Sequence, residues 1–307
     1  MPPTGLMKTL PTAQTLADAG ITPSEHDLRT LPRDHLVRLY GSRSGRIVLT
    51  RLFRALAWQI VSERRQGPQE ASYGNLRSLW YSHAKPLLAR LPDDDALATD
   101  PYDRLGEVFA ELVMDKRLFS YADLGIVDEN WENRRIGDRR PEIVVFAEKT
   151  GWVHWLRQVH AAWGVTTLAL GGMPSAITSS YTAAHLLEVL DGPRPRVKLI
   201  GVVDYDPAGR AIAAAFQHQL GQAGLTDTEL ETVIHPRHYT DAQLDLFAYE
   251  LSRRQPSHNA TWLEATGGVR GRALGLEADS LPKPKVTELV GRLIDRDTAP
   301  PQRSGIT

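Results

Sequence analysis

Short apolar runs alternate with amphipathic segments through the second half of the chain. Three such runs are each followed by a segment with helical spacing: 142–147 by 150–163, 165–170 by 177–190, and 197–204 by 207–222. Repeated strand–helix pairs of this length predict a parallel sheet with helices on both faces. We therefore expect an α/β, Rossmann-like domain over residues 142–300, with a mostly helical C-terminal part.

The first half of the chain has helical spacing without this alternation. Apolar residues at intervals of three and four predict an amphipathic helix within residues 31–65. A second helix is predicted over 74–91, where Pro86 bends or splits it, and a third over Tyr102–Asp115. Residues 117–131 have the strand and turn character of a short hairpin.

Three helices followed by a hairpin are typical of a winged-helix (CAP-like) DNA-binding domain, which we expect over residues 29–133. The Pro- and Thr-rich residues 1–28 predict a flexible arm, and the polar, basic residues 134–141 predict a linker. The predicted fold class is therefore α/β plus mostly α, in two domains.

Composition narrows the class of protein. The 307 residues are 42% hydrophobic and 24% charged, as in soluble globular proteins, and no apolar run reaches 18 residues. We expect no membrane partner. The chain has no cysteine, which excludes disulfides, thiolate catalysis and cysteine-ligated zinc, and fits a reducing cytoplasm.

Positive charge is concentrated in the first half, although the net charge is only −1. Twelve basic residues lie between Arg29 and Arg90, against three acidic ones. Such a local excess is typical of contact with a phosphate backbone, and a solvated helical face is the alternative. The candidate DNA-binding residues are Arg43, Arg46, Arg51, Arg54 and Lys85.

Acidic residues follow two of the predicted strands. Glu148 ends the first apolar run, and Asp204 and Asp206 end the third. Carboxyl ends of parallel strands gather at one edge of a sheet, and carboxylate oxygens are the ligands that Mg²⁺ prefers. The sequence therefore predicts a magnesium site of Glu148, Asp204 and Asp206, in which Mn²⁺ can substitute. The alternative is that one Asp caps the following helix and the other is solvated.

The order of these features resembles a Toprim domain, the metal-binding module of topoisomerases, primases and related nucleases. The resemblance lies in Glu148 after the first strand, Gly171-Gly172 after the second, and Asp204-x-Asp206 after the third. It implies phosphodiester chemistry but does not separate a topoisomerase from a hydrolytic nuclease.

The first half adds a second resemblance. Arg77-Ser78-Leu79-Trp80-Tyr81 is similar to the Arg-x-x-aromatic-Tyr signature of topoisomerase VI A subunits and meiotic double-strand-break proteins, with Ser78 where that family usually has Asp. Other similar segments follow in the family's order: EKTGWVHWL, GGMPSAIT, DYDPAGRAIA and LGLEADSL. The resemblance covers residues 45–296 and is to the compact kind of A subunit.

This resemblance implies that Tyr81 is the nucleophile that cleaves double-stranded DNA and stays linked to its 5′ phosphate. Arg77, four residues earlier on the same helical face, would stabilise the phenolate or the phosphate. Glu148 would hold Mg²⁺ or carry a proton to the leaving oxygen. The resemblance also implies a homodimer, a nucleoid-associated location in the cytoplasm, and a separate GHKL-type ATPase subunit as a further partner.

Two other functions stay open. The chain also resembles the Toprim nucleases of plasmid-defence systems, which hydrolyse DNA with water and form no covalent intermediate. The third hypothesis is a DNA-binding subunit that keeps the Toprim fold but has no enzymatic activity. For Tyr81 itself, the alternative to a nucleophile is an ordinary core aromatic residue beside Trp80.

Overall fold

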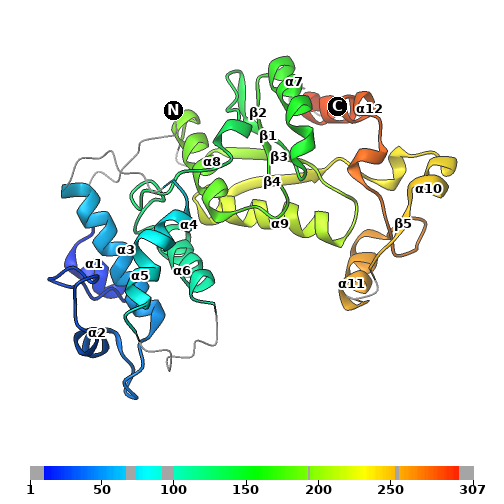
Figure 1. Cartoon of the computed structure of the whole chain (residues 1–307). Helices are drawn as coiled ribbons and strands as arrows, with labels where there is room; N and C mark the ends of the chain where they lie inside the picture. The colour runs from blue at the N-terminus through cyan, green and yellow to red at the C-terminus, as the bar shows by residue number, and fades with distance from the viewer. Residues whose placement is uncertain (1–9, 67–73, 92–99, 193, 253–255, 297–307) are drawn as a thin grey trace, which may run out of the picture. The chain divides into compact units, whose positions relative to one another are not determined.

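A computed structural model gives the structure of the chain and describes residues 10–66, 74–91, 100–192, 194–252 and 256–296. The chain divides into two compact units (Figure 1). Unit 1 is Met1–Trp131 with Ala176–Tyr181, and unit 2 is Glu132–Ser175 with Thr182–Thr307. The return of residues 176–181 to unit 1 has no signal in the sequence.

Unit 1 is built from helices. They are α1 (Ala13–Asp18), α2 (Arg33–Tyr40), α3 (Leu49–Gln66), α4 (Leu76–Leu79), α5 (Lys85–Leu88) and α6 (Pro101–Ala110), with π-helical turns η1 (Trp80–Ala84) and η2 (Glu111–Asp115). The apolar spacing of α3 buries Leu52, Leu56 and Ile60, and α6 packs against this helix. The amphipathic pattern therefore forms the core of unit 1.

Two expectations for unit 1 need correction. Residues 10–28 are not a loose arm, because α1 forms there and Leu16, Ile21 and Leu28 are buried; residues 1–9 lie outside the described part. The hairpin expected over 117–131 is also absent from the described residues. Turns fill this segment, and its one bridge joins Ile126 to Gly74. The winged-helix form is therefore not confirmed.

Unit 2 is an α/β domain around a parallel sheet. Its strands are β1 (Arg140–Ala147), β2 (Val165–Ala169), β3 (Arg196–Val202) and β4 (Asp227–Thr232), in the order β2-β1-β3-β4. Its helices include α7 (Val153–Trp163), α8 (Ala176–Val189, which begins in unit 1), α9 (Pro207–Gln222) and α12 (Lys283–Arg296). Strands and helices alternate as predicted, which is compatible with a Rossmann-like domain.

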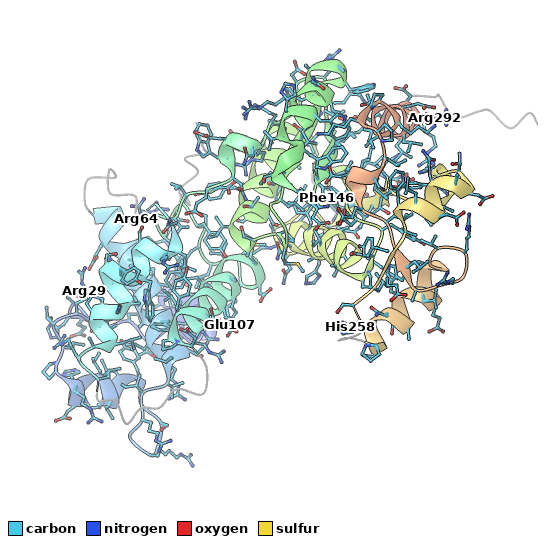
Figure 2. All side chains as sticks on the ribbon, turned by 45° about the vertical axis from the view of Figure 1, so that its right-hand side comes forward. Arg29, Arg64, Glu107, Phe146, His258 and Arg292 are labelled. Carbon is cyan, nitrogen blue, oxygen red and sulfur yellow. The ribbon has the colours of Figure 1, made fainter. Side chains whose placement is uncertain are left out.

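Both faces of this sheet are covered by helices. Val145 and Ile200 face α7 and α12 in one core cluster. Val144 and Phe146 face α8 and α9 in the other, where the rings of Phe146 and Phe216 lie 5.0 Å apart (Figure 2). The strands are therefore buried on both sides, which explains their continuous apolar runs.

The C-terminal part of unit 2 is mostly helical and returns to the sheet. It contains α10 (Asp241–Phe247), β5 (Tyr249–Glu250), α11 (Pro256–Thr266) and β6 (Leu274–Gly275). Short 3₁₀ turns lie at Pro236–His238 and Ala278–Ser280 in this region, and at Trp131–Asn133 and Thr150–Trp152 earlier in the chain. β5 pairs with β6, and Leu276 exchanges two backbone hydrogen bonds with Tyr205. The segment after β6 is thereby held beside the end of β3.

One strand boundary differs from the prediction, and one strand was not predicted. β1 begins at Arg140, inside the segment 134–141 predicted as a linker, and Arg135 already bridges to Thr167 of β2. β4 was not predicted, because its DTELET sequence has the polarity of a loop. It is an edge strand, and acidic side chains on an edge oppose pairing with other chains.

Candidate functional site

The candidate acidic site lies where β1 and β3 end. The chain passes from β1 to β2 on one side, and β3 and β4 lie on the other, so the strand order reverses between β1 and β3. Ligands of open α/β sheets bind outside the carboxyl ends of the strands at such a point. Glu148 and Asp204 follow these two strands, which explains why residues far apart in sequence meet.

Glu148 and Asp204 are linked directly. The backbone N–H of Asp204 donates a hydrogen bond of 3.3 Å to the Glu148 carboxylate. Burial raises the pKa of Glu148, and the negative charges of Asp204 and Asp206 raise it further. The hydrogen bond from the backbone of Asp204 and the positive charge of Lys149 lower this pKa, but not enough to cancel the increase. The site therefore holds more negative charge than its own residues neutralise.

Lys149 is the cation of this cluster. Its Nζ lies 3.1 Å from Asp204 and 3.4 Å from both Glu277 and Asp279. Partial burial lowers the pKa of Lys149, but the hydrogen bond to Asp204 and the surrounding carboxylates raise it more. The pKa of Lys149 therefore lies above its ordinary value. The other oxygen of Asp204 accepts a 2.8 Å hydrogen bond from the backbone N–H of Ala278. Asp204 is thus held from two sides.

Asp206 has a different environment. It is the N-cap of α9, where its Oδ1 accepts a 2.7 Å bond from the N–H of Gly209. A side chain at Gly209 would place its Cβ 2.1 Å from the Asp204 carbonyl oxygen, so the glycine of Asp-x-Asp-Pro-x-Gly is required here. The helix-cap alternative is therefore correct for Asp206.

The second oxygen of Asp206 binds a tyrosine. The Tyr249 hydroxyl donates a 2.6 Å hydrogen bond to Oδ2, and burial together with this bond raises the pKa of Tyr249 far above its ordinary value. Gly275 leaves room for the ring, because a Cβ there would lie 2.5 Å from it. Tyr249 therefore fixes the orientation of the Asp206 carboxylate.

The donor chemistry of this site fits a hard cation such as Mg²⁺. The carboxylates of Glu148 and Asp204 lie close together, and Lys149 is the cation that lowers the pKa of Glu148 there. Within the described ranges, however, no three Asp, Glu or His side chains stand as a ready metal-binding group. Both oxygens of Asp206 already accept hydrogen bonds, from Gly209 and Tyr249. A metal ion bound by all three predicted ligands would compete with these two bonds.

Tyr81 belongs to unit 1 and lies on an exposed helical face. Its side chain is 52% exposed, so it is not a core aromatic residue. Arg77 and Lys85 are exposed as well, and the Lys85 ammonium lies 5.0 Å from the centre of the Tyr81 ring. The predicted nucleophile is thus open to solvent and next to a positive charge.

A π-helical turn carries Tyr81. The N–H of Lys85 donates to the Trp80 carbonyl five residues earlier, which widens the turn. In a regular α-helix the Pro86 ring would press on the Ser82 carbonyl, so the wider turn accommodates the proline. Pro86 therefore neither splits nor ends this helical segment.

The candidate DNA-binding arginines differ in availability. Arg43 and Arg46 are exposed on a tight turn closed by a bridge between Gly41 and Ile47, and Arg51 is exposed beside it. Arg54 instead donates from its Nη2 to both carboxylate oxygens of Glu111, at 2.8 and 2.9 Å, which makes it a structural residue of unit 1. Arg29 is similarly held by Asp27 and Glu63.

Sequence reasoning did not find Lys149 as a counter-ion or Tyr249 as a partner of Asp206. Lys149 directly follows Glu148 in the sequence. A lysine next to a predicted acidic metal ligand was therefore a signal from which its role as a counter-ion could have been predicted. Nothing near Tyr249 in the sequence connects it to Asp206, which is 43 residues away. Their pairing depends on β5 and β6.

No family model and no curated protein matches this chain. The resemblance to topoisomerase VI A subunits therefore stays a prediction. Among the described helices, none combines the length and apolar character needed to cross a lipid bilayer.

Proposed function

We propose that the chain cleaves and rejoins double-stranded DNA in the manner of a type IIB topoisomerase A subunit, with Mg²⁺ as cofactor. The observation that supports this most is the acidic cluster at the β1/β3 switch point, where Glu148 and Asp204 are joined by a hydrogen bond. The exposed Tyr81 beside Lys85 supplies a nucleophile that a purely structural helix would not need to expose.

The reaction that we propose is a transesterification at one phosphate of each strand. The Tyr81 oxygen bonds to phosphorus as the bond from phosphorus to the 3′ oxygen breaks. The phenolic proton leaves to solvent, and the 3′ oxygen takes up a proton. One phosphodiester replaces another, so resealing by the reverse step needs no ATP.

The other roles in this reaction are proposed for separate groups of residues. Arg77 and Lys85 hold positive charge near Tyr81, where phosphate and phenolate are negative. Glu148, Asp204 and Asp206 would hold Mg²⁺, which supplies positive charge to the phosphate and the leaving oxygen when bound. Arg43, Arg46 and Arg51 would contact the backbone of the duplex. For the N-terminal unit we propose a winged-helix type of DNA binding.

A double-strand break needs two active centres, so we propose a homodimer with two-fold symmetry. Strand passage in the family that the chain resembles uses an ATPase subunit. We propose that a GHKL-type ATPase is an additional partner for that step, and that cleavage itself needs only the dimer.

Covalent attachment is the test of this proposal. Labelled duplex DNA is incubated with the protein and Mg²⁺ or Mn²⁺, denatured, and separated with and without protease treatment. We expect 5′ ends that carry protein, and we expect Tyr81→Phe to abolish them while DNA binding stays within about twofold. Tyr121→Phe, at a buried tyrosine of the same unit, is the matched control.

The nuclease alternative gives a different result. Free 5′-phosphate ends, formed equally well by Tyr81→Phe, would show hydrolysis by water instead of transesterification. In both cases Asp204→Asn should stop cleavage. If cleavage persists in Asp204→Asn, the acidic cluster takes part in neither mechanism.

A further inference from the structure

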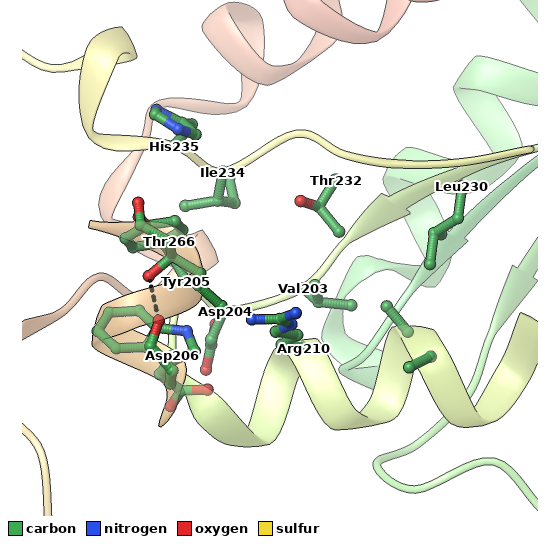
Figure 3. A pocket seen from close by; sticks show the side chains of 14 residues that line it. Val203, Asp204, Tyr205, Asp206, Arg210, Leu230, Thr232, Ile234, His235 and Thr266 are labelled. Atoms are coloured by element: carbon green, nitrogen blue, oxygen red, sulfur yellow. Dashed lines mark hydrogen bonds between the residues drawn. The ribbon is translucent and has the colours of Figure 1, made fainter. Parts of the chain in front are cut away.

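Unit 2 has a cavity next to the acidic cluster. The cavity has a volume of about 410 Å³ and lies between α9, the end of β4 and α11, and Asp204 and Asp206 form part of its wall (Figure 3). Small-molecule sites have volumes of roughly 300–1,000 Å³. The cavity therefore has the size of a ligand site, and it lies next to the proposed chemistry.

The walls of this cavity are mostly apolar and aromatic. Val203, Ala213, Leu230, Ile234 and Trp262 contribute to them. The Tyr205 ring packs against Trp262 and His235 with ring centres 5.2 and 5.4 Å apart. Its hydroxyl also donates to the Thr266 carbonyl, so this aromatic end is fixed before a ligand arrives. Such a lining accepts a flat, uncharged group.

Three further polar side chains line the cavity from two sides. Arg210 extends from α9 and is exposed, and among the described residues its guanidinium has no hydrogen bond or salt bridge, although two aspartates share the cavity. The Thr232 hydroxyl and the His235 ring are the others (Figure 3). The Nδ1 of His235 accepts the N–H of Arg237, so its Nε2 carries the hydrogen and is a donor. Burial and the charge of Arg237 lower the pKa of His235, which favours the neutral ring.

We propose that this cavity binds a nucleobase that has left the DNA stack next to the scissile phosphate, with Arg210 on the adjoining phosphate. An apolar and aromatic lining, the guanidinium of Arg210 and the polar groups of Thr232 and His235 match a base attached to a phosphate. The inference rests on the proposed function, because Mg²⁺ held by the acidic cluster would bring the DNA backbone to this edge. A base inside a stacked duplex cannot enter, so one base must unstack.

The inference predicts a preference for DNA in which a base leaves the stack easily. Unstacking costs least at a mismatch. We therefore expect a short duplex with one central 2-aminopurine mismatch to bind at least about fivefold more tightly than the fully paired duplex, because less free energy is spent on unstacking the mismatched base. The 2-aminopurine fluorescence should rise on binding, which reports unstacking even if the protein cuts no DNA.

Ala214→Phe is the decisive variant. Ala214 lines the cavity but is exposed on α9, so the new ring fills the cavity without entering the core. We expect it to remove both the fluorescence rise and the preference for the mismatch. Ala161→Phe, at an exposed position of α7 that does not line the cavity, should change neither. Arg210→Ala should weaken binding of mismatched DNA about fivefold, and Arg210→Lys should restore part of it.

The outcomes separate this inference from the proposed function. Covalent cleavage with no fluorescence rise, or a rise that Ala214→Phe leaves intact, would overturn the inference alone. A rise that depends on Ala214 without covalent cleavage would support the cavity and count against the transesterase. Binding of free deoxynucleotides to the cavity with equal affinity for paired and mismatched duplex would show a small-molecule site, and would also overturn the inference.

Discussion

The charge balance around Glu148 predicts how this side chain responds to pH. Unfolded Glu148 loses its proton near its ordinary pKa of 4.5, and the folded protein raises that pKa, because burial and the charges of Asp204 and Asp206 outweigh Lys149. The folded state therefore binds the proton more tightly. Stability falls as pH rises through this window, and the full penalty is present above it.

Glu148→Gln removes that penalty. We expect the variant to unfold at a higher temperature than the wild type in chelator, with a difference that is small at pH 4 and larger at pH 8. Each kcal/mol regained corresponds to roughly 2–4 °C in a chain of this size. Added Mg²⁺ should stabilise the wild type more than the variant. Glu264→Gln, at an exposed position of α11, should show neither effect.

At the residue scale the sequence predicts chemistry better than geometry. Glu148, Asp204 and Asp206 were found because strand ends of a parallel sheet meet at one edge. That Asp206 caps α9 and binds Tyr249 was beyond the sequence, since a hydrogen bond across 43 residues depends on the path of the C-terminal segment. Local motifs identify the acidic residues, and long-range packing sets their orientation.

At the element scale, the π-helical turn η1 determines where Tyr81 points. The turn accommodates Pro86, and the Ser82 hydroxyl donates 2.8 Å to the Ser78 carbonyl within it. Pro86→Ala restores an N–H donor and removes the steric reason for the wider turn. The helix is then free to become regular, which rotates residues before Pro86 relative to those after it.

We expect Pro86→Ala to keep or raise the unfolding temperature and to lower covalent DNA attachment by about tenfold. Thermal unfolding and the denaturing gel measure the two quantities. Pro101→Ala, at the first turn of α6, is the control, because proline there needs no wider turn. If attachment by Pro86→Ala equals that of the wild type, the π turn has no part in placing the tyrosine.

Elements with a strong apolar period were predictable, and weakly patterned ones were not. α9 has the predicted bounds, and β1 to β3 lie where their apolar runs indicated. β4 escaped prediction because an edge strand exposes acidic side chains. The expected hairpin after α6 is replaced by turns because Asp123 and Ser120 bind each other and the local backbone there.

At the scale of the whole molecule, the candidate residues divide between the two units. Tyr81, Arg77 and Lys85 belong to unit 1, and Glu148, Asp204 and Asp206 belong to unit 2. A reaction that uses both sets combines them either within one chain or between the two chains of a dimer. The sequence supports a dimer only through the family that it resembles, so this arrangement needs a direct experiment.

A mixed dimer distinguishes the two arrangements. Tyr81→Phe and Asp204→Asn subunits, each inactive alone, are unfolded together and refolded, or co-expressed with different tags. If centres form between chains, the mixed dimer has one centre with an intact tyrosine and intact acids, and one centre that lacks both. We expect it to nick one strand and to remain attached to the new 5′ end. If each centre forms within one chain, both centres of the mixed dimer are defective and no attachment appears. Nicking in one strand only, by the doubly tagged species alone, would therefore place the tyrosine and the acids of each centre on different subunits.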